Sequence, residues 1–178
     1  MEFVSKTVRM MILSVNLVDQ MYHWSLGGEE LKYNVGEIGR TIIAKIEHDD
    51  DLLESIKYLA RKEDLESAVF FMLGALKSSR IVVGPKEIVI PPEGIHHYFE
   101  DGREILAIGT IFSNEQGEPL LHIHGAMGRE ESAIVGCIRD LTKVYLVIEL
   151  IIIELKGTGV QRLYDPELLL HALSIPDK

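Results

Sequence analysis

Apolar positions at helical spacing define one helix in the chain. A segment rich in β-branched residues, Thr41 to Glu47, predicts a strand and leads into the acidic cluster His48 to Asp51. Beyond the cluster, apolar residues recur every three or four positions, at Leu52, Leu53, Ile56, Leu59 and Ala60. This periodicity predicts an amphipathic helix that runs to about Lys62. Asp51 and Glu54 have the spacing of a capping box, so we expect Asp51 to cap the first turn.

Strand patterns fill most of the chain after this helix. Turn residues separate them, with Gly74 to Leu76 predicted as a bend and Asn114 to Gly117 as a hairpin loop. Pro91-Pro92 is expected to stop a strand, because proline lacks the backbone donor that a ladder needs. The predicted strands are Ser67 to Leu73, Arg80 to Val83, Glu87 to Ile90, Arg103 to Phe112, Leu120 to Met127, Ser132 to Asp140 and Lys143 to Leu155.

The order of these elements indicates a fold class. Asp165-Pro166 predicts a short helix from Glu167 to Leu173, since proline suits the first helical position. One principal helix among about seven strands predicts an α+β domain, a mainly antiparallel twisted sheet of about six to seven strands with the helix packed on it. We expect this domain to span residues 34–166, followed by a short helix and tail over 167–178.

Residues 1–33 have a different pattern and are predicted to form an amino-terminal extension. Val8 to Val18 is apolar nearly all round, and Ser25 to Gly28 follows as a breaker. The segment fits an appended helix or strand that docks on the domain or on a neighbouring subunit. An overlong translation start is the alternative, because Met10, Met11 and Met21 all follow the first residue.

Length and composition fit one globular domain outside the membrane. The chain has 178 residues and is 47% apolar. Its longest apolar run, Val144 to Leu155, contains two glutamates and is shorter than the roughly 20 residues of a membrane helix. The first residues carry no small-residue cleavage site, so no signal peptide is predicted. A single cysteine excludes an internal disulfide, and we expect a cytoplasmic protein.

The net charge disfavours DNA as the main partner. It is −10, from 28 acidic against 18 basic residues, and a protein that grips phosphates usually carries the opposite sign. A local basic patch would still permit DNA binding. None of the glycine-rich phosphate-binding motifs follows a predicted strand.

The candidate chemistry gathers in one predicted hairpin. His122 and His124 are two apart on a strand, so both imidazoles point to the same face. If Met127 pairs with Ser132 across the turn, Cys137 lies opposite His122 on that face. Two imidazoles and a thiolate suit zinc and leave a fourth coordination position open. A slip of one residue would turn Cys137 to the other face.

Each of these residues also has a reading without metal. A His-x-His pair often occurs with no ligand, and a lone cysteine is often a small buried hydrophobe. His96 and His97 form a second pair, expected in a loop, from which one could reach the site. Glu118, Glu130 and Glu131 flank the hairpin and could assist a metal-bound water as a base, or could simply be solvated turn charges.

Five pieces of the chain, in order, resemble the PPC family (plants and prokaryotes conserved domain), of the prokaryotic single-domain type. The first two are the helix start Asp51 to Ile56, like D-L-L-E-x-[LI], and Ala68 to Ala75, like G-x-[LI]-G-[AS]. Ile105 to Thr110 is similar to the family segment [LI]-x-x-G. The segment Gly117 to His124 is similar to the family motif G-x-P-x-x-H-x-H. The fifth, Val135 to Ile138, stands where the family commonly has G-G-H.

The resemblance implies a twisted, mainly antiparallel sheet with a principal helix, a homotrimer, and zinc held by three histidines. Carried over by position, the ligands are His122, His124 and Cys137. The cysteine departs from the family's histidine, but it is also a good zinc ligand. Plant members bind A·T-rich DNA through a separate R-G-R-P motif, which this chain lacks.

Three functions follow as hypotheses. The first is a metal-binding, homo-oligomeric interaction or regulatory module. The second is a small metal-dependent enzyme, hydrolase-like, which would need an acidic group near the metal. The third is DNA binding, which the charge and the missing motif disfavour.

Overall fold

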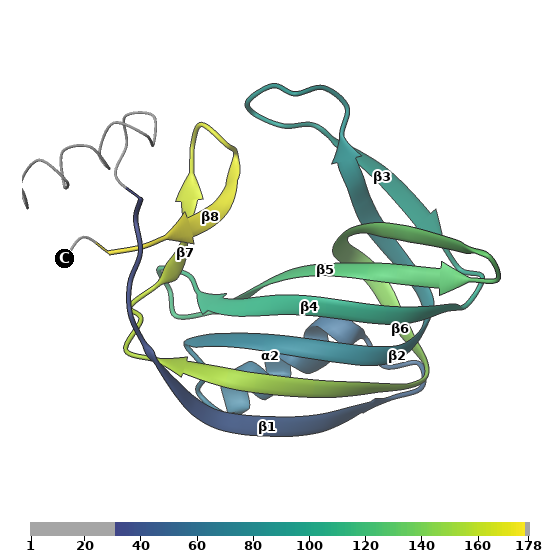
Figure 1. The fold of residues 1–178 in the computed structure, drawn as a ribbon, viewed down its shortest axis with the longest axis horizontal. Coiled ribbons are helices and arrows are strands. Elements are labelled where there is room, and N and C mark those ends of the chain that lie inside the picture. The colour runs from purple at the N-terminus through teal and green to yellow at the C-terminus, as the bar shows by residue number, and fades with distance from the viewer. Residues whose placement is uncertain (1–30, 177–178) are drawn as a thin grey trace, which may run out of the picture. The chain divides into compact units, whose positions relative to one another are not determined.

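The computed structural model describes residues 31–176, so the apolar segment Val8 to Val18 and most of the predicted extension lie outside it. From Asn34 onward the chain forms one unit. Its elements are β1 (Glu37–Glu47), α2 (Leu52–Lys62), β2 (Ser67–Pro85), β3 (Gly94–Phe99), β4 (Arg103–Ser113), β5 (Pro119–Arg129), β6 (Ser132–Lys156), β7 (Gln161–Asp165) and β8 (Leu170–Ser174) (Figure 1). The predicted mainly antiparallel sheet with one principal helix is therefore confirmed for the described residues, in which strands dominate.

Six strands form one sheet that closes on itself. The order is β1-β6-β5-β4-β2-β3, and an additional pairing joins β6 to β2. The pairs β2–β4, β4–β5, β5–β6 and β6–β2 are all antiparallel and complete a ring of four strands. The ring closes because the two longest strands, β2 and β6, bend and pair along both of their halves. Strands β7 and β8 form a separate two-stranded sheet.

Helix α2 covers one side of the sheet (Figure 1) and fills the core. Its cap is as predicted, because the Asp51 carboxylate accepts hydrogen bonds from the backbone N–H groups of Leu53 and Glu54, both at 3.1 Å. The Glu54 side chain bonds Lys57 at 2.8 Å. Leu52, Ile56 and Ala60 are buried against the sheet. Each large apolar side chain buried in this way contributes about 1.5–3 kcal/mol.

Two predicted breaks in the strands are wrong. Strand β2 bends at Gly74 but does not end there, and an added Cβ at this glycine would lie 2.1 Å from the carbonyl oxygen of Val147. Strand β6 continues past Asp140 with Leu141 at a φ of 52°. The ladder between the two strands shifts register at several places, including beside Gly74. Such bulges bend a strand without ending it, so a local breaker signal does not mark a strand end here.

Three other predictions are also wrong. Glu87 to Ile90 is an exposed loop, whereas His96 and His97 lie in strand β3. The predicted helix Glu167 to Leu173 is absent, and its residues form the turn and first part of β8. Asp165 does accept bonds from the N–H groups of the next turn, at 2.8 and 3.0 Å. That cap serves a hairpin turn, because β7 and β8 then pair with each other.

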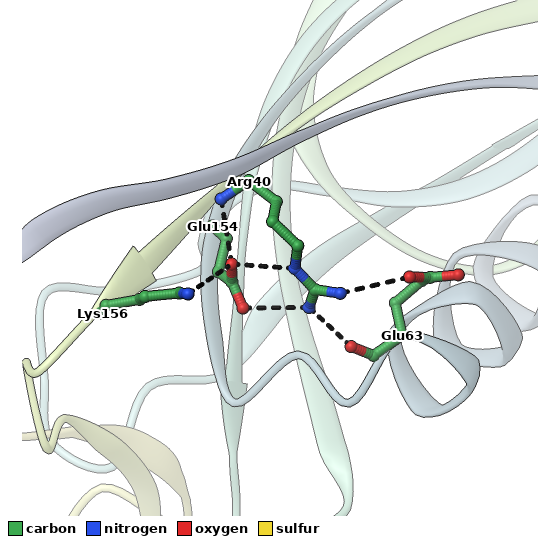
Figure 2. A network of polar contacts seen from close by, with 4 residues as sticks. All are labelled: Arg40, Glu63, Glu154 and Lys156. Atoms are coloured by element: carbon green, nitrogen blue, oxygen red, sulfur yellow. Dashed lines mark hydrogen bonds and ion pairs between the residues drawn. The ribbon is translucent and has the colours of Figure 1, made fainter.

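A network of charged residues ties β1, α2 and β6 together (Figure 2). Arg40 donates from Nε and Nη2 to the two carboxylate oxygens of Glu154, both at 3.0 Å. It also donates to the backbone carbonyl of Glu63 at the end of α2, at 2.7 Å. Lys156 Nζ lies 3.7 Å from the Glu154 carboxylate. We call these four residues the charge network.

Candidate metal centre

The two histidines of the predicted site lie side by side on strand β5. Their side chains point to the outer face of the sheet, while Ile123 between them points into the core. The Nε2 atoms of His122 and His124 are 3.1 Å apart, and the rings meet edge to face. The prediction that both histidines of the His-x-His pair point to one face is therefore confirmed.

Cys137 reaches the same face from strand β6, but in another register than predicted. The hairpin loop is shorter than predicted, because Arg129, and not Met127, pairs with Ser132, and only two residues form the loop. Glu130 takes a φ of 54° in this loop, as a tight hairpin turn requires. Cys137 therefore lies opposite His124, and the predicted pairing with His122 is wrong. A shift of two residues preserves the face, so the thiol still points at the imidazoles.

The three side chains form a donor set that a zinc ion would fit. His122, His124 and Cys137, here called the metal triad, place their donor atoms within 4.8 Å of one another. A tetrahedral zinc site with ordinary Zn–N and Zn–S bonds has its donors roughly 3.3–3.6 Å apart. Small side-chain rotations would bring the triad into that range. The fourth position is open on the protein side, because no other described His, Cys, Asp or Glu joins the group.

Desolvation changes the pKa of two members of the triad, His122 and Cys137. Desolvation lowers the pKa of His122 to about 4, with the charges of Arg162, His124 and Arg139 acting in the same direction. His122 is therefore neutral at pH 7 and has a lone pair to offer a metal. Desolvation raises the pKa of the Cys137 thiol, which is only 4% exposed. A metal ion that binds there must displace the thiol proton.

The closure of the ring places the cysteine. Cys137 pairs with His124 on one side and with Val82 of β2 on the other. At the preceding residue, Gly136, an added Cβ would lie 2.5 Å from the carbonyl oxygen of Val82. Glycine thus permits the close approach of β2 and β6 that fixes the position of Cys137.

Two arginines next to the triad were not predicted. Arg162 on β7 donates from Nη2 to the hydroxyl of Thr110 at 3.0 Å, and Thr110 pairs directly with His122. The guanidinium also lies 5.8 Å from the centre of the Phe112 ring. Arg139 is two residues beyond Cys137. No sequence signal links Arg162 to the site, because its place depends on how the chain folds back after β6.

The other candidates from the sequence do not join the triad. His96 and His97 lie on β3 and pair with Val82 and Ile81 of β2, and neither belongs to the donor group. Glu118 is bound to Arg61 at 2.8 Å. Glu130 and Glu131 form the hairpin turn, at the end of the ladder away from the histidines. The carboxylates considered as possible bases are thus outside the site.

A closed antiparallel ring with two histidines and a cysteine on its outer face describes the class of domain. The sequence profile of the Plants and Prokaryotes Conserved (PCC) domain matches residues 33–156. The chain therefore belongs to this family, as the five motifs indicated. No curated protein is similar to it at a significant level.

Solved structures share the fold. A metal-containing protein from Archaeoglobus fulgidus has a TM-score of 0.71 at 19% identity, over 81% of this chain and 99% of its own. A plant- and prokaryote-conserved protein from Pyrococcus horikoshii has a TM-score of 0.68 at 26% identity, over 80% and 96%. A Ralstonia eutropha protein named as a candidate for DNA binding has a TM-score of 0.62 at 21% identity, over 75% and 90%. No helix within residues 31–176 has the length and apolarity to cross a membrane.

Proposed function

We propose that this chain is a zinc-binding, homo-oligomeric PPC-domain protein of the cytoplasm that acts as an interaction or regulatory module. The observation that carries the proposal is the metal triad, three donors of the right chemistry within 4.8 Å of one another. Its two imidazoles and one thiolate favour zinc over the harder divalent ions. The similar protein from Archaeoglobus fulgidus, described as metal-containing, supports a metal in this fold.

His122, His124 and Cys137 would hold the ion. Bound zinc would supply a Lewis acid with one open coordination position. His122 is kept neutral and can offer its lone pair, whereas the buried Cys137 thiol would give up its proton to the ion. A reducing compartment suits such a thiol, which is why the proposal includes the cytoplasm.

The outer face that carries the triad also supports self-assembly. Ile108 of β4 pairs with His124 on one side and with Phe71 of β2 on the other, so apolar side chains and a metal ligand form one row. The row next to it contains Leu73 and Leu106. Exposed apolar side chains on this face include Ile43, Phe71, Leu73, Leu106, Ile108 and Val135. A patch of this kind is usually covered by a partner.

We propose other copies of this chain as that partner, in the homotrimer that the family resemblance implies. Leu106→Glu would place a charge in the middle of the apolar face and should convert the assembly to monomers in light-scattering measurements of mass. Ile88→Glu is the matched control, because Ile88 is fully exposed in the β2–β3 loop, and it should leave the mass unchanged. A wild-type protein that is monomeric at high concentration would contradict the assembly.

The two other functions have less support. A hydrolase would need a base at the open position, and within residues 31–176 no carboxylate joins the triad. DNA binding has the name of the Ralstonia eutropha protein in its favour, but the net charge of −10 opposes it.

Metal analysis tests the metal site. Wild-type protein purified under metal-replete conditions should carry about one zinc per chain, and His124→Ala and Cys137→Ser should carry much less. His96→Ala removes a histidine outside the triad and should keep the full content. A wild-type protein without zinc would remove the basis of the proposal.

A further inference from the structure

The arginines of the chain divide into two groups. Residues 31–176 contain seven of them, and the five away from the metal triad each lie within 4.0 Å of a carboxylate oxygen: Arg40, Arg61, Arg80, Arg103 and Arg129. The two that form no ion pair within this part of the chain are Arg139 and Arg162, whose charges act on His122 and Cys137. In a chain with a net charge of −10, two arginines without a carboxylate at one site are an unusual concentration of positive charge.

Arg162 is held in place by one hydrogen bond and has a further N–H group that forms none. Its Nη2 group is fixed by the Thr110 hydroxyl, and its plane lies near the Phe112 ring. Its Nε–H group is buried and has no hydrogen-bond partner. A buried polar donor without a partner costs free energy, and a charged one costs more. Burial also lowers the pKa of this guanidinium from its usual value, which is a sign of its desolvation.

The metal-loaded site would also carry positive charge, like the two arginines beside it. A zinc ion with one thiolate ligand keeps one positive charge, and the two guanidinium groups bring the total to three. None of the groups acting on His122, Cys137 or Arg162 is a carboxylate. An anion at the open coordination position would lower this total, and a dianion would do so most. Arginine is suited to binding such an anion, because its planar guanidinium group matches the oxygens of phosphates and carboxylates.

We propose that the open position of the metal triad takes an oxyanion, of which a phosphate group is the preferred class, and that Arg162 holds it beside the metal. Arg139 adds charge at the rim of the site. The inference rests on the proposed metal site, and it assigns that site a ligand class that Arg162 selects. A bound oxyanion would give the Nε–H group of Arg162 a partner after a small rotation of the side chain.

Cobalt(II) in place of zinc gives a direct readout, because its visible absorption changes when a fourth ligand changes. The cobalt-loaded full chain, freed of excess metal, is titrated with inorganic phosphate, and heat of binding is measured in parallel. Phosphate should shift the spectrum and saturate in the wild type. Arg162→Met should weaken this binding about tenfold to a hundredfold, the loss typical of a charge-assisted hydrogen bond. The phosphate affinity of Arg162→Lys should lie between those of the wild type and Arg162→Met.

The control variant is Arg80→Met, which removes an arginine that Asp140 already neutralises and should bind phosphate like the wild type. Cobalt content and the thermal unfolding midpoint are measured for every variant. A parallel titration with acetate distinguishes a carboxylate from a phosphate ligand, and weaker binding of acetate supports the phosphate class. Equal or tighter binding of acetate overturns that preference.

Three results overturn the proposal in different ways. If the wild type takes up cobalt at one per chain but phosphate changes neither spectrum nor heat, the oxyanion site is wrong and the metal site stands. If phosphate binds the wild type and Arg162→Met equally tightly, the role of Arg162 in holding the oxyanion is wrong and the metal site again stands. If the wild type takes up no cobalt, the proposed metal site is wrong, and the oxyanion inference is wrong with it.

Discussion

The charge network and the metal triad use similar side chains in opposite ways. In the charge network, Arg40 and Glu154 meet in a two-pronged contact, and Arg40 also caps the end of α2 (Figure 2). Every charge there has a partner from the chain itself. At the triad, a buried thiol, a neutral histidine and two arginines meet with no carboxylate among the described residues. The first region is complete within the described chain, and the second lacks counter-charges.

This difference separates a structural role from a binding role. Paired charges that join three elements contribute to the stability of the fold and have little left to offer a ligand. Donors that converge without partners carry a desolvation cost in the unbound protein and recover it when a ligand binds. Variants in the two regions should therefore change different measurements.

The largest expected effect is on zinc affinity. Cys137→Ser or His124→Ala should weaken zinc binding by at least about a hundredfold, because a ligand matters more than the supporting residues whose loss typically costs 10–100-fold. Competition with a chromogenic chelator measures this. Glu154→Gln should leave zinc affinity unchanged. Equal loss in the triad and network variants would mean that both act through folding, and the division between the two regions would be wrong.

The next effect is on stability and its dependence on pH. Glu154 has its pKa lowered to about 2 in the folded chain, from an ordinary value of 4.5, chiefly by hydrogen bonds from Arg40. The unfolded chain therefore binds more protons between these values. The stabilisation is fully present above about pH 4.5 and is lost as the pH falls toward 2.

Glu154→Gln should therefore lower the thermal midpoint by a few degrees at pH 7 and by progressively less as the pH falls below 4.5. Thermal melts of zinc-free protein at several pH values measure the difference. Glu149→Gln, on the same strand but outside any ion pair described for residues 31–176, should match the wild type. A Glu154→Gln deficit that stays constant down to pH 2 would show that packing, and not the charge, is responsible.

The smallest effect is at the cap of α2. Asp51→Ala removes the acceptor for two backbone N–H groups and should cost about 1 kcal/mol in the free energy of unfolding. Asp51→Asn should restore most of it, since asparagine caps as well as aspartate. Urea unfolding checks both. A zinc affinity altered by Asp51→Ala would contradict the independence of the cap and the triad.

The sequence predicted local features well and long-range features less well. The cap at Asp51, the helix and the common face of His122 and His124 depend on spacing along one element, and all three were found. The exact partner of Cys137 depended on the loop length, and the predicted loop was longer than the observed one by one residue pair. Arg162 could not be predicted, because its position depends on the path of the chain beyond β6.

The strand ends show the same limit. Gly74 and the turn-like residues near Asp140 both fall within long strands, since bulges and ring closure carry the backbone past them. The glycine at position 136 was more informative, because its small size is needed where β2 meets β6 beside the triad. The residues that usually break strands thus marked bends in the sheet. The role of these bends in closing the ring became clear only from the pairing of β2 with β6.

X-ray absorption at the zinc edge tests the central claim most directly. We predict a zinc shell with one sulfur at about 2.3 Å and two imidazole nitrogens at about 2.0–2.1 Å, completed by one lighter atom. The sulfur contribution should disappear in Cys137→Ser. A wild-type shell made only of nitrogen and oxygen would contradict the account, because Cys137 would then be a packing residue beside a different metal site.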